Sequence, residues 1–114
     1  MAQTAYDKAL YLLSSREHTE KELKEKLSLK GYGQEDIEGA AVRLKRENYL
    51  SEERFAEVYI RSRLRKSPEG KSILSLRLQE KGTPRGVAQA ALQEAWERGD
   101  YLEPLKEAYS SYER

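Results

Sequence analysis

The sequence predicts an all-α protein built of tandem three-helix repeats that form an elongated, curved helical array. Good helix formers fill nearly every segment of the 114 residues, with only three prolines. Glycines, prolines and N-capping residues stand where helix ends require them. Only 38% of the residues are hydrophobic and 36% are charged, so thin, well-solvated layers are expected in place of one thick core.

The first three predicted helices each carry an apolar stripe at helical spacing. The first covers residues 5–16. The second opens at Thr19, which has the capping-box spacing with Glu22, and it stops at Gly31, which tolerates a left-handed closing conformation. The third covers residues 34–47 and ends at Asn48. The predicted stripes are Ala5, Ala9, Leu12 and Leu13; then Leu23 and Leu27; then Ile37, Ala40, Ala41 and Leu44.

The next helices follow the same rules. Ser51 is expected to cap a fourth helix over residues 52–66, and Pro68 to occupy the first position of the fifth, which closes at Gly82. Thr83 followed by Pro84 repeats that device for a sixth helix ending at Gly99, and a seventh is expected over residues 102–112. The stripes are Phe55, Ala56, Tyr59 and Ile60; Ile73, Leu74 and Leu78; Ala88, Ala91, Leu92 and Ala95; and Leu102, Leu105, Tyr109 and Tyr112.

An internal repeat sets the domain organisation. Leu23, Leu27 and the pair Lys30-Gly31 return 51 residues later as Leu74, Leu78 and Lys81-Gly82. Each half is too small to bury its own apolar face, as is typical of stacked repeats. We therefore expect a first three-helix repeat over residues 1–50, a second over 51–100, and the first helix of an incomplete third repeat over 101–114.

The composition argues against several classes of function. The 21 lysines and arginines nearly balance the 20 acidic residues, so net charge predicts neither nucleic-acid nor membrane binding. Cysteine is absent, which favours a cytoplasmic location, and neither a signal peptide nor an apolar run of membrane-spanning length is evident. A monomer is expected.

Catalysis, metal binding and cofactor binding have no support in the sequence. His18 is the sole histidine, and we predict a helix-junction residue bonded to nearby backbone. No glycine-rich phosphate loop follows a predicted strand, and the carboxylates lie scattered among lysines on helix faces. The sequence therefore predicts a binding protein and not an enzyme.

A cluster of basic residues is the strongest candidate site. From residue 60 to residue 77 there are six basic residues and one acid, Glu69. Arg54, Arg61 and Arg65 fall on one line of the fourth helix, pointing away from its apolar stripe, and would offer charged donors to carboxylates or phosphates. Arg63 lies within the stripe and is expected to be half-buried beside a carboxylate. The alternative is an ordinary solvated helix face. The basic residues of the candidate site are Arg54, Arg61, Arg63, Arg65, Lys66, Lys71 and Arg77.

Three blocks of sequence resemble the RecX family of bacterial regulatory proteins. They are the segment 16–23 with Leu27 and residues 30–32, the segment 49–56 running into residues 61–63, and the segment 70–73 with Leu78 and residues 81–82. The blocks occur in the family's order over about residues 10–95. The resemblance is therefore more specific than any single motif.

The resemblance implies tandem three-helix repeats that bind the RecA recombinase filament, lying in its groove near single-stranded DNA. It implies inhibition of strand exchange, ATP hydrolysis and co-protease activity, and hence modulation of DNA repair and the SOS response. The family's basic helix corresponds to Arg54, Arg61, Arg63 and Arg65, followed by Lys71. Lys71 stands where the family usually has proline, and Arg77 where it usually has an acid. Both differences increase the local positive charge.

Two other functions stay open at the level of sequence. A helical nucleic-acid-binding module could contact DNA directly through the same basic cluster, and log affinity would then fall steeply with log salt. A helical scaffold could instead self-associate through Leu102, Leu105 and Tyr109. The favoured mechanism is multivalent docking of the arginine row onto acidic surfaces of successive recombinase subunits.

Overall fold

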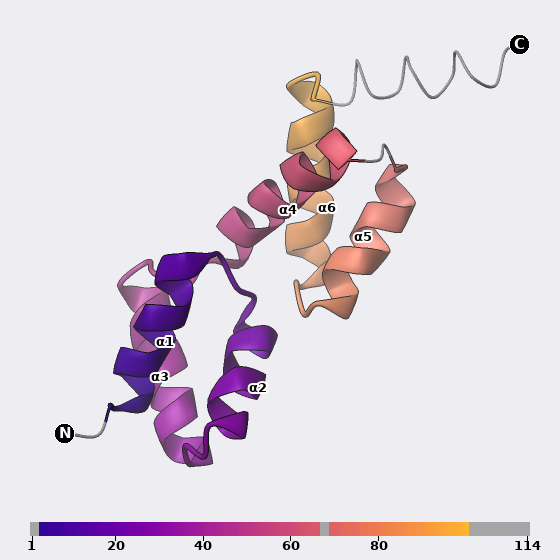
Figure 1. Cartoon of the computed structure of the whole chain (residues 1–114). Coiled ribbons are helices and arrows are strands. Elements are labelled where there is room, and N and C mark those ends of the chain that lie inside the picture. The colour runs from indigo at the N-terminus through magenta and orange to yellow at the C-terminus, as the bar shows by residue number, and fades with distance from the viewer. Residues whose placement is uncertain (1–2, 67–68, 101–114) are drawn as a thin grey trace, which may run out of the picture. The chain divides into compact units, whose positions relative to one another are not determined.

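The structure of the chain is a computed structural model that describes residues 3–66 and 69–100. Within these ranges the chain forms helices joined by short links (Figure 1). The helices are α1 (Ala5–Ser15), α2 (Glu20–Leu29), α3 (Gln34–Arg46), α4 (Glu52–Lys66), α5 (Lys71–Glu80) and α6 (Arg85–Glu97). No strand occurs within these ranges, which confirms the all-α prediction. The expected seventh helix and its apolar stripe lie outside the described residues.

Two compact units make up the chain, Met1–Phe55 and Ala56–Arg114, and the division falls inside α4. In the first unit, α1, α2 and α3 all contact one another. The buried cluster at their centre is lined further by half-buried tyrosines and leucines of α1 and the α2–α3 link. Its buried members are Ala9, Leu23, Leu27, Ile37, Ala41, Leu44 and Leu50.

Side-chain caps define where the first two helices begin. Thr4 and Asp7 form a capping box at α1, and Thr19 and Glu22 form the predicted one at α2. In the second box, the Glu22 amide donates to Thr19 Oγ1 at 3.1 Å and the Thr19 amide donates to Glu22 Oε1 at 3.1 Å. Thr19 is buried, so this cap also closes the end of the core.

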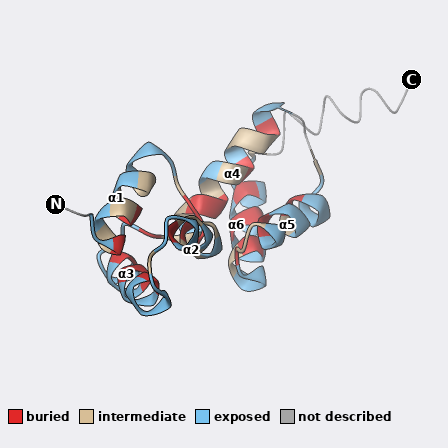
Figure 2. Cartoon of the chain, turned by 60° about the horizontal axis from the view of Figure 1, so that its bottom comes forward, coloured by how far each residue is buried: buried red, intermediate tan, exposed pale blue. Residues whose placement is uncertain are grey.

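The core of the second unit is drawn from α4, α5 and α6. Figure 2 shows the buried residues (red) on one side of each helix and the exposed ones on the other. Ile73 was predicted to be buried but is 49% exposed, since it lies about 100° around the helix from Leu74 and faces away from the Leu74–Leu78 line. The buried residues are Ala56, Ile60, Leu64, Leu74, Leu78, Ala88, Ala91, Leu92 and Ala95.

The internal repeat is confirmed by the helix bounds. Helix α5 begins and ends 51 residues after α2, and α6 does the same relative to α3. The turns match as well. The Tyr32 amide donates to Leu27 O at 3.3 Å, and the Thr83 amide donates to Leu78 O at 3.0 Å. The glycine before each of these residues, Gly31 or Gly82, has a positive φ, as predicted for a left-handed closing residue.

Two predicted helix starts were wrong. Helix α5 begins at Lys71 with Gly70 as its N-cap, and not at Pro68. Helix α6 begins at Arg85, and Pro84 is the N-cap because its ψ of 144° is extended. Thr83 is buried at the turn and does not cap the helix. No helix within the described ranges has both the length and the apolar character needed to cross a membrane.

Candidate functional site

The last two turns of α4 present three exposed members of the predicted basic cluster. Arg61, Arg65 and Lys66 are exposed, and none of them forms a hydrogen bond or ion pair with another residue that the structure describes. Arg61 and Arg65 are one helical turn apart, so they lie on one face. Arg65 and Lys66 lie in the last turn of α4, where a positive charge interacts favourably with the helix dipole.

Arg63 and Arg77 are held by one carboxylate. Arg63 donates to Glu69 Oε1 through Nε at 3.1 Å and Nη2 at 2.8 Å, and Arg77 donates to Glu69 Oε2 through Nε at 2.9 Å. The Glu69 side chain is only 12% exposed. The hydrogen bonds from Arg63, followed by those from Arg77, hold the pKa of Glu69 below its usual range despite its desolvation. The prediction of a half-buried, carboxylate-paired Arg63 is confirmed.

Arg54 departs from the expected outward row. Its Nε lies 2.7 Å from Glu17 Oε1, and its Nη2 donates to the Tyr49 carbonyl at 2.9 Å. The α1–α2 link brings Glu17 to this first turn of α4, which is why a side chain pointing away from the stripe is nevertheless half-buried. Nearby, Glu52 Oε1 accepts a hydrogen bond from the Glu20 amide at 2.7 Å. Arg54 therefore holds the first turn of α4 to the α1–α2 link within the first unit.

Lys71 occupies a different setting from the arginines. Its Nζ lies 4.6 Å from the centroid of the Trp96 ring, at the start of α5 and the end of α6. A cation over an indole face is attracted by the ring quadrupole. Sequence reasoning gave Trp96 no role. The signal that the sequence offered was its repeat position, since Trp96 lies 51 residues after Lys45.

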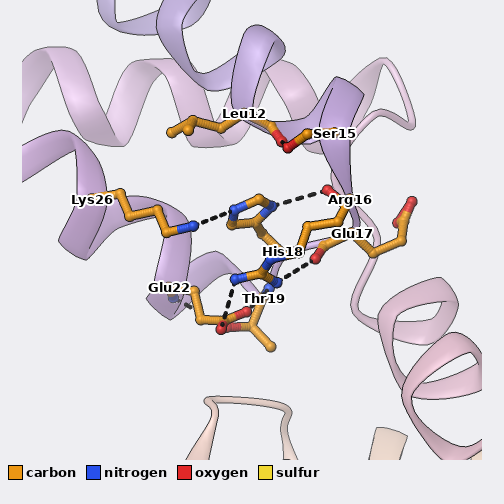
Figure 3. Close-up of polar contacts among 8 residues, drawn as sticks. All are labelled: Leu12, Ser15, Arg16, Glu17, His18, Thr19, Glu22 and Lys26. Atoms are coloured by element: carbon orange, nitrogen blue, oxygen red, sulfur yellow. Dashed lines mark hydrogen bonds and ion pairs between the residues drawn. The ribbon is translucent and has the colours of Figure 1, made fainter. Parts of the chain in front are cut away.

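His18 is buried at the helix junction, as predicted, and is bonded to backbone (Figure 3). Its Nδ1 lies 3.0 Å from the Arg16 carbonyl oxygen, and its Nε2 lies 2.9 Å from Lys26 Nζ. A proton on Nδ1 leaves Nε2 to accept from the ammonium, which is the neutral imidazole. Burial, aided by the charges of Arg16 and Lys26, lowers the pKa of His18. The ring is therefore a structural acceptor, and the described residues hold no group of potential metal ligands around it.

Comparison with known proteins identifies the family. The family model for the first three-helix domain of RecX matches residues 5–44, and the model for its second three-helix domain matches residues 51–92. The chain belongs to the RecX family. The first range contains α1, α2 and most of α3, and the second contains α4, α5 and the first half of α6, so the two RecX domains coincide with the two copies of the internal repeat.

Individual RecX relatives agree with this assignment. The Regulatory protein RecX of Prosthecochloris aestuarii is 39% identical over 90 residues, which are 79% of this chain and 60% of the relative. That of Geobacillus thermodenitrificans is 33% identical over 110 residues, or 96% of this chain and 39% of the relative. The crystal structure of RecX from Lactobacillus salivarius superimposes with a TM-score of 0.74 at 28% identity, covering 94% of this chain and 73% of that one. The chain thus spans about 60% or less of these two curated relatives.

Proposed function

We propose that this chain regulates recombination by binding the RecA recombinase filament and inhibiting its strand-exchange, ATPase and co-protease activities. Membership in a family of regulatory proteins supports a role in regulation. The observation that carries the proposal is the exposed set Arg61, Arg65 and Lys66, which has no carboxylate partner among the described residues. These cations are available to bind an acidic surface, because no ion pair with another described residue has to be broken first.

The electrostatics favour recognition through this set over attraction by the whole chain. The net charge is only +1, so long-range steering by the molecule as a whole is weak. Three cations within six residues form a local positive potential that acts within a Debye length of about 8 Å at physiological salt. Guanidinium groups in addition match carboxylates in a two-pronged geometry, which gives orientation as well as attraction. The binding is therefore expected to be specific in position and weakened by salt.

The test is recombinase-driven ATP hydrolysis on single-stranded DNA, with increasing amounts of this chain. Inhibition below one chain per recombinase subunit is expected from the wild type. The double variant Arg61→Glu/Arg65→Glu should need a concentration about tenfold or more higher for the same inhibition, since two favourable charge contacts become repulsive. The matched control is Lys30→Glu/Arg46→Glu, which changes the net charge equally at two exposed cations of the first unit.

The control should inhibit like the wild type, and circular dichroism should show equal helicity in all three proteins. Equal inhibition by the Arg61→Glu/Arg65→Glu variant and the wild type would contradict the proposal. Direct action on DNA is the competing outcome. In that case the chain binds naked single-stranded DNA without recombinase, and log affinity falls with log salt by about 0.7 per phosphate contact.

A further inference from the structure

A groove runs along the second unit between α5 and α6. It encloses about 440 Å³, and its floor includes the buried Leu92. Leu76 also lines the groove and has 60% of its surface exposed. The two helices lie side by side and run in opposite directions (Figure 1). The lining residues are Lys71, Ser72, Ser75, Leu76, Gln79, Arg85, Gln89, Leu92 and Gln93.

The charges of this groove are all of one sign. Lys71 stands at the start of α5 and Arg85 at the start of α6, which places them at opposite ends because the helices are antiparallel. No carboxylate is among the described residues that line it. Between the two cations lie serine hydroxyls, glutamine amides and leucine side chains. The groove is therefore amphipathic, with a positive charge at each end and an uncharged centre in which leucines stand among serines and glutamines.

The same place in the first repeat is closed by ion pairs. At the offset of 51 residues, Ser75 corresponds to Lys24 and Gln89 to Glu38. Lys24 Nζ lies 2.9 Å from Glu38 Oε2 and so joins α2 to α3 across the corresponding gap. In the second repeat a serine and a glutamine replace that pair, and the centre of the gap carries no charge.

The end of the gap differs in the same way. In the first repeat, Glu20 pairs with Lys24 at 2.6 Å and also with Lys45. The corresponding residues of the second repeat are Lys71 and Trp96, which form the cation–π contact. One backbone framework thus carries an internally neutralised surface in the first repeat and an open, positively charged groove in the second.

We propose that the α5–α6 groove binds an acidic amphipathic helix of a partner protein. The two end cations call for two carboxylates, and Leu76 and Leu92 in the lining call for an apolar side chain between them. The stretch of α5 from Lys71 to Gln79 extends about 12 Å along the groove, or roughly two helical turns. The two acidic residues of the bound helix should therefore be about eight residues apart. A nucleic-acid strand fits less well, since the described lining contains only two cations. This proposal stands apart from the recombinase proposal, because it depends on neither Arg61 nor Arg65.

The test uses a designed helical peptide and the intact chain. The probe is a capped peptide of about 15 residues with glutamate, leucine and glutamate four residues apart, and its counterpart carries lysines in place of the glutamates. Trp96 is the sole tryptophan and contacts Lys71 at one end of the groove, so its fluorescence reports on binding. The glutamate peptide should change the emission saturably, and the lysine peptide should not.

Two variants test the location. Ser75→Lys/Gln89→Glu copies the ion pair of the first repeat into the groove and should weaken peptide binding by about tenfold or more, the equivalent of losing one buried apolar contact. The control Gly86→Glu/Ala90→Lys places the same two charges one turn apart on the exposed side of α6, outside the groove, and should leave affinity within about twofold. Arg85→Glu, at an exposed position, should weaken binding of the glutamate peptide and strengthen binding of a peptide in which one glutamate is replaced by lysine.

Several results would overturn the proposal. They are the absence of saturable binding by the glutamate peptide, equal binding by the Ser75→Lys/Gln89→Glu variant and the wild type, and failure of the Arg85→Glu charge exchange. A thymidine oligonucleotide that binds more tightly than the peptide, and is weakened by the same double variant, would assign the groove to nucleic acid instead. None of these measurements contains recombinase, so their failure is distinguishable from failure of the proposed function.

Discussion

Replacing Gly31 by alanine isolates the cost of the turn that ends α2. Gly31 has a φ of +93°, and a Cβ added there would meet nothing within 4 Å, so the penalty is purely conformational. The left-handed region costs an L-residue about 1–2 kcal/mol. Alanine also restricts the unfolded chain and recovers about 0.4–1 kcal/mol. The free energy of unfolding should therefore fall by about 1 kcal/mol.

Gly39 supplies a matched substitution of opposite sign. It is exposed within α3, its φ is not positive, and an added Cβ would again meet nothing within 4 Å. Gly39→Ala should raise the free energy of unfolding by about 0.5–1 kcal/mol, because alanine is the better helix former. Gly31→Asn should lose less than Gly31→Ala, since the chain itself has Asn48 with a φ of 65° after α3.

Urea unfolding followed by circular dichroism compares the three variants with the wild type, and the midpoints can be ranked provided that the slopes agree. Stability of Gly31→Ala equal to that of the wild type would refute the conformational argument, as would equal effects of alanine at both glycines.

Two further variants examine the α1–α2 junction. Thr19→Ala removes the oxygen that accepts from the Glu22 amide and should lower the free energy of unfolding by about 1 kcal/mol in urea titrations, whereas Thr19→Ser should retain most of it. Burial lowers the pKa of His18 in the folded chain. Below a pH of about 6.5, the ordinary pKa of histidine, the unfolded chain therefore binds a proton that the folded chain does not. Stability should therefore fall as the pH drops from about 6.5 towards the lowered pKa, and unfolding midpoints of His18→Gln should follow pH less steeply. A slope unchanged by that substitution would mean that another group is responsible.

Local signals in the sequence predicted most of the fold correctly. The capping box at Thr19, the closing glycines and the stripe of α3 all depend on residues within one or two turns of each other, so their spacing is visible in the chain. The start of α5 was misplaced because proline is compatible with the first turn of a helix without requiring it. The burial of Leu64 was missed because it extends the stripe of α4 by one further turn.

The candidate site was less predictable, because it depends on which carboxylate reaches which arginine. Helical spacing placed Arg54 with Arg61, yet Glu17, 37 residues away, pairs with Arg54. Spacing also could not show that Glu69 holds both Arg63 and Arg77. A helical wheel gives the direction of a side chain but contains no information on the side chains that approach it from other elements.

By itself, the sequence determined the six described helices, the capping box at Thr19 and the 51-residue repeat, since these depend on short-range hydrogen bonding and on the period of apolar residues. Only the tertiary structure decided which cations remain exposed and which gap between helices stays open. Ion pairs join residues distant in the chain, so the exposed Arg61 and the paired Arg54 look alike in sequence. The α5–α6 groove is likewise lined by Ser75 and Gln89 at the positions where the first repeat has the Lys24–Glu38 ion pair, which only the packing of the helices reveals.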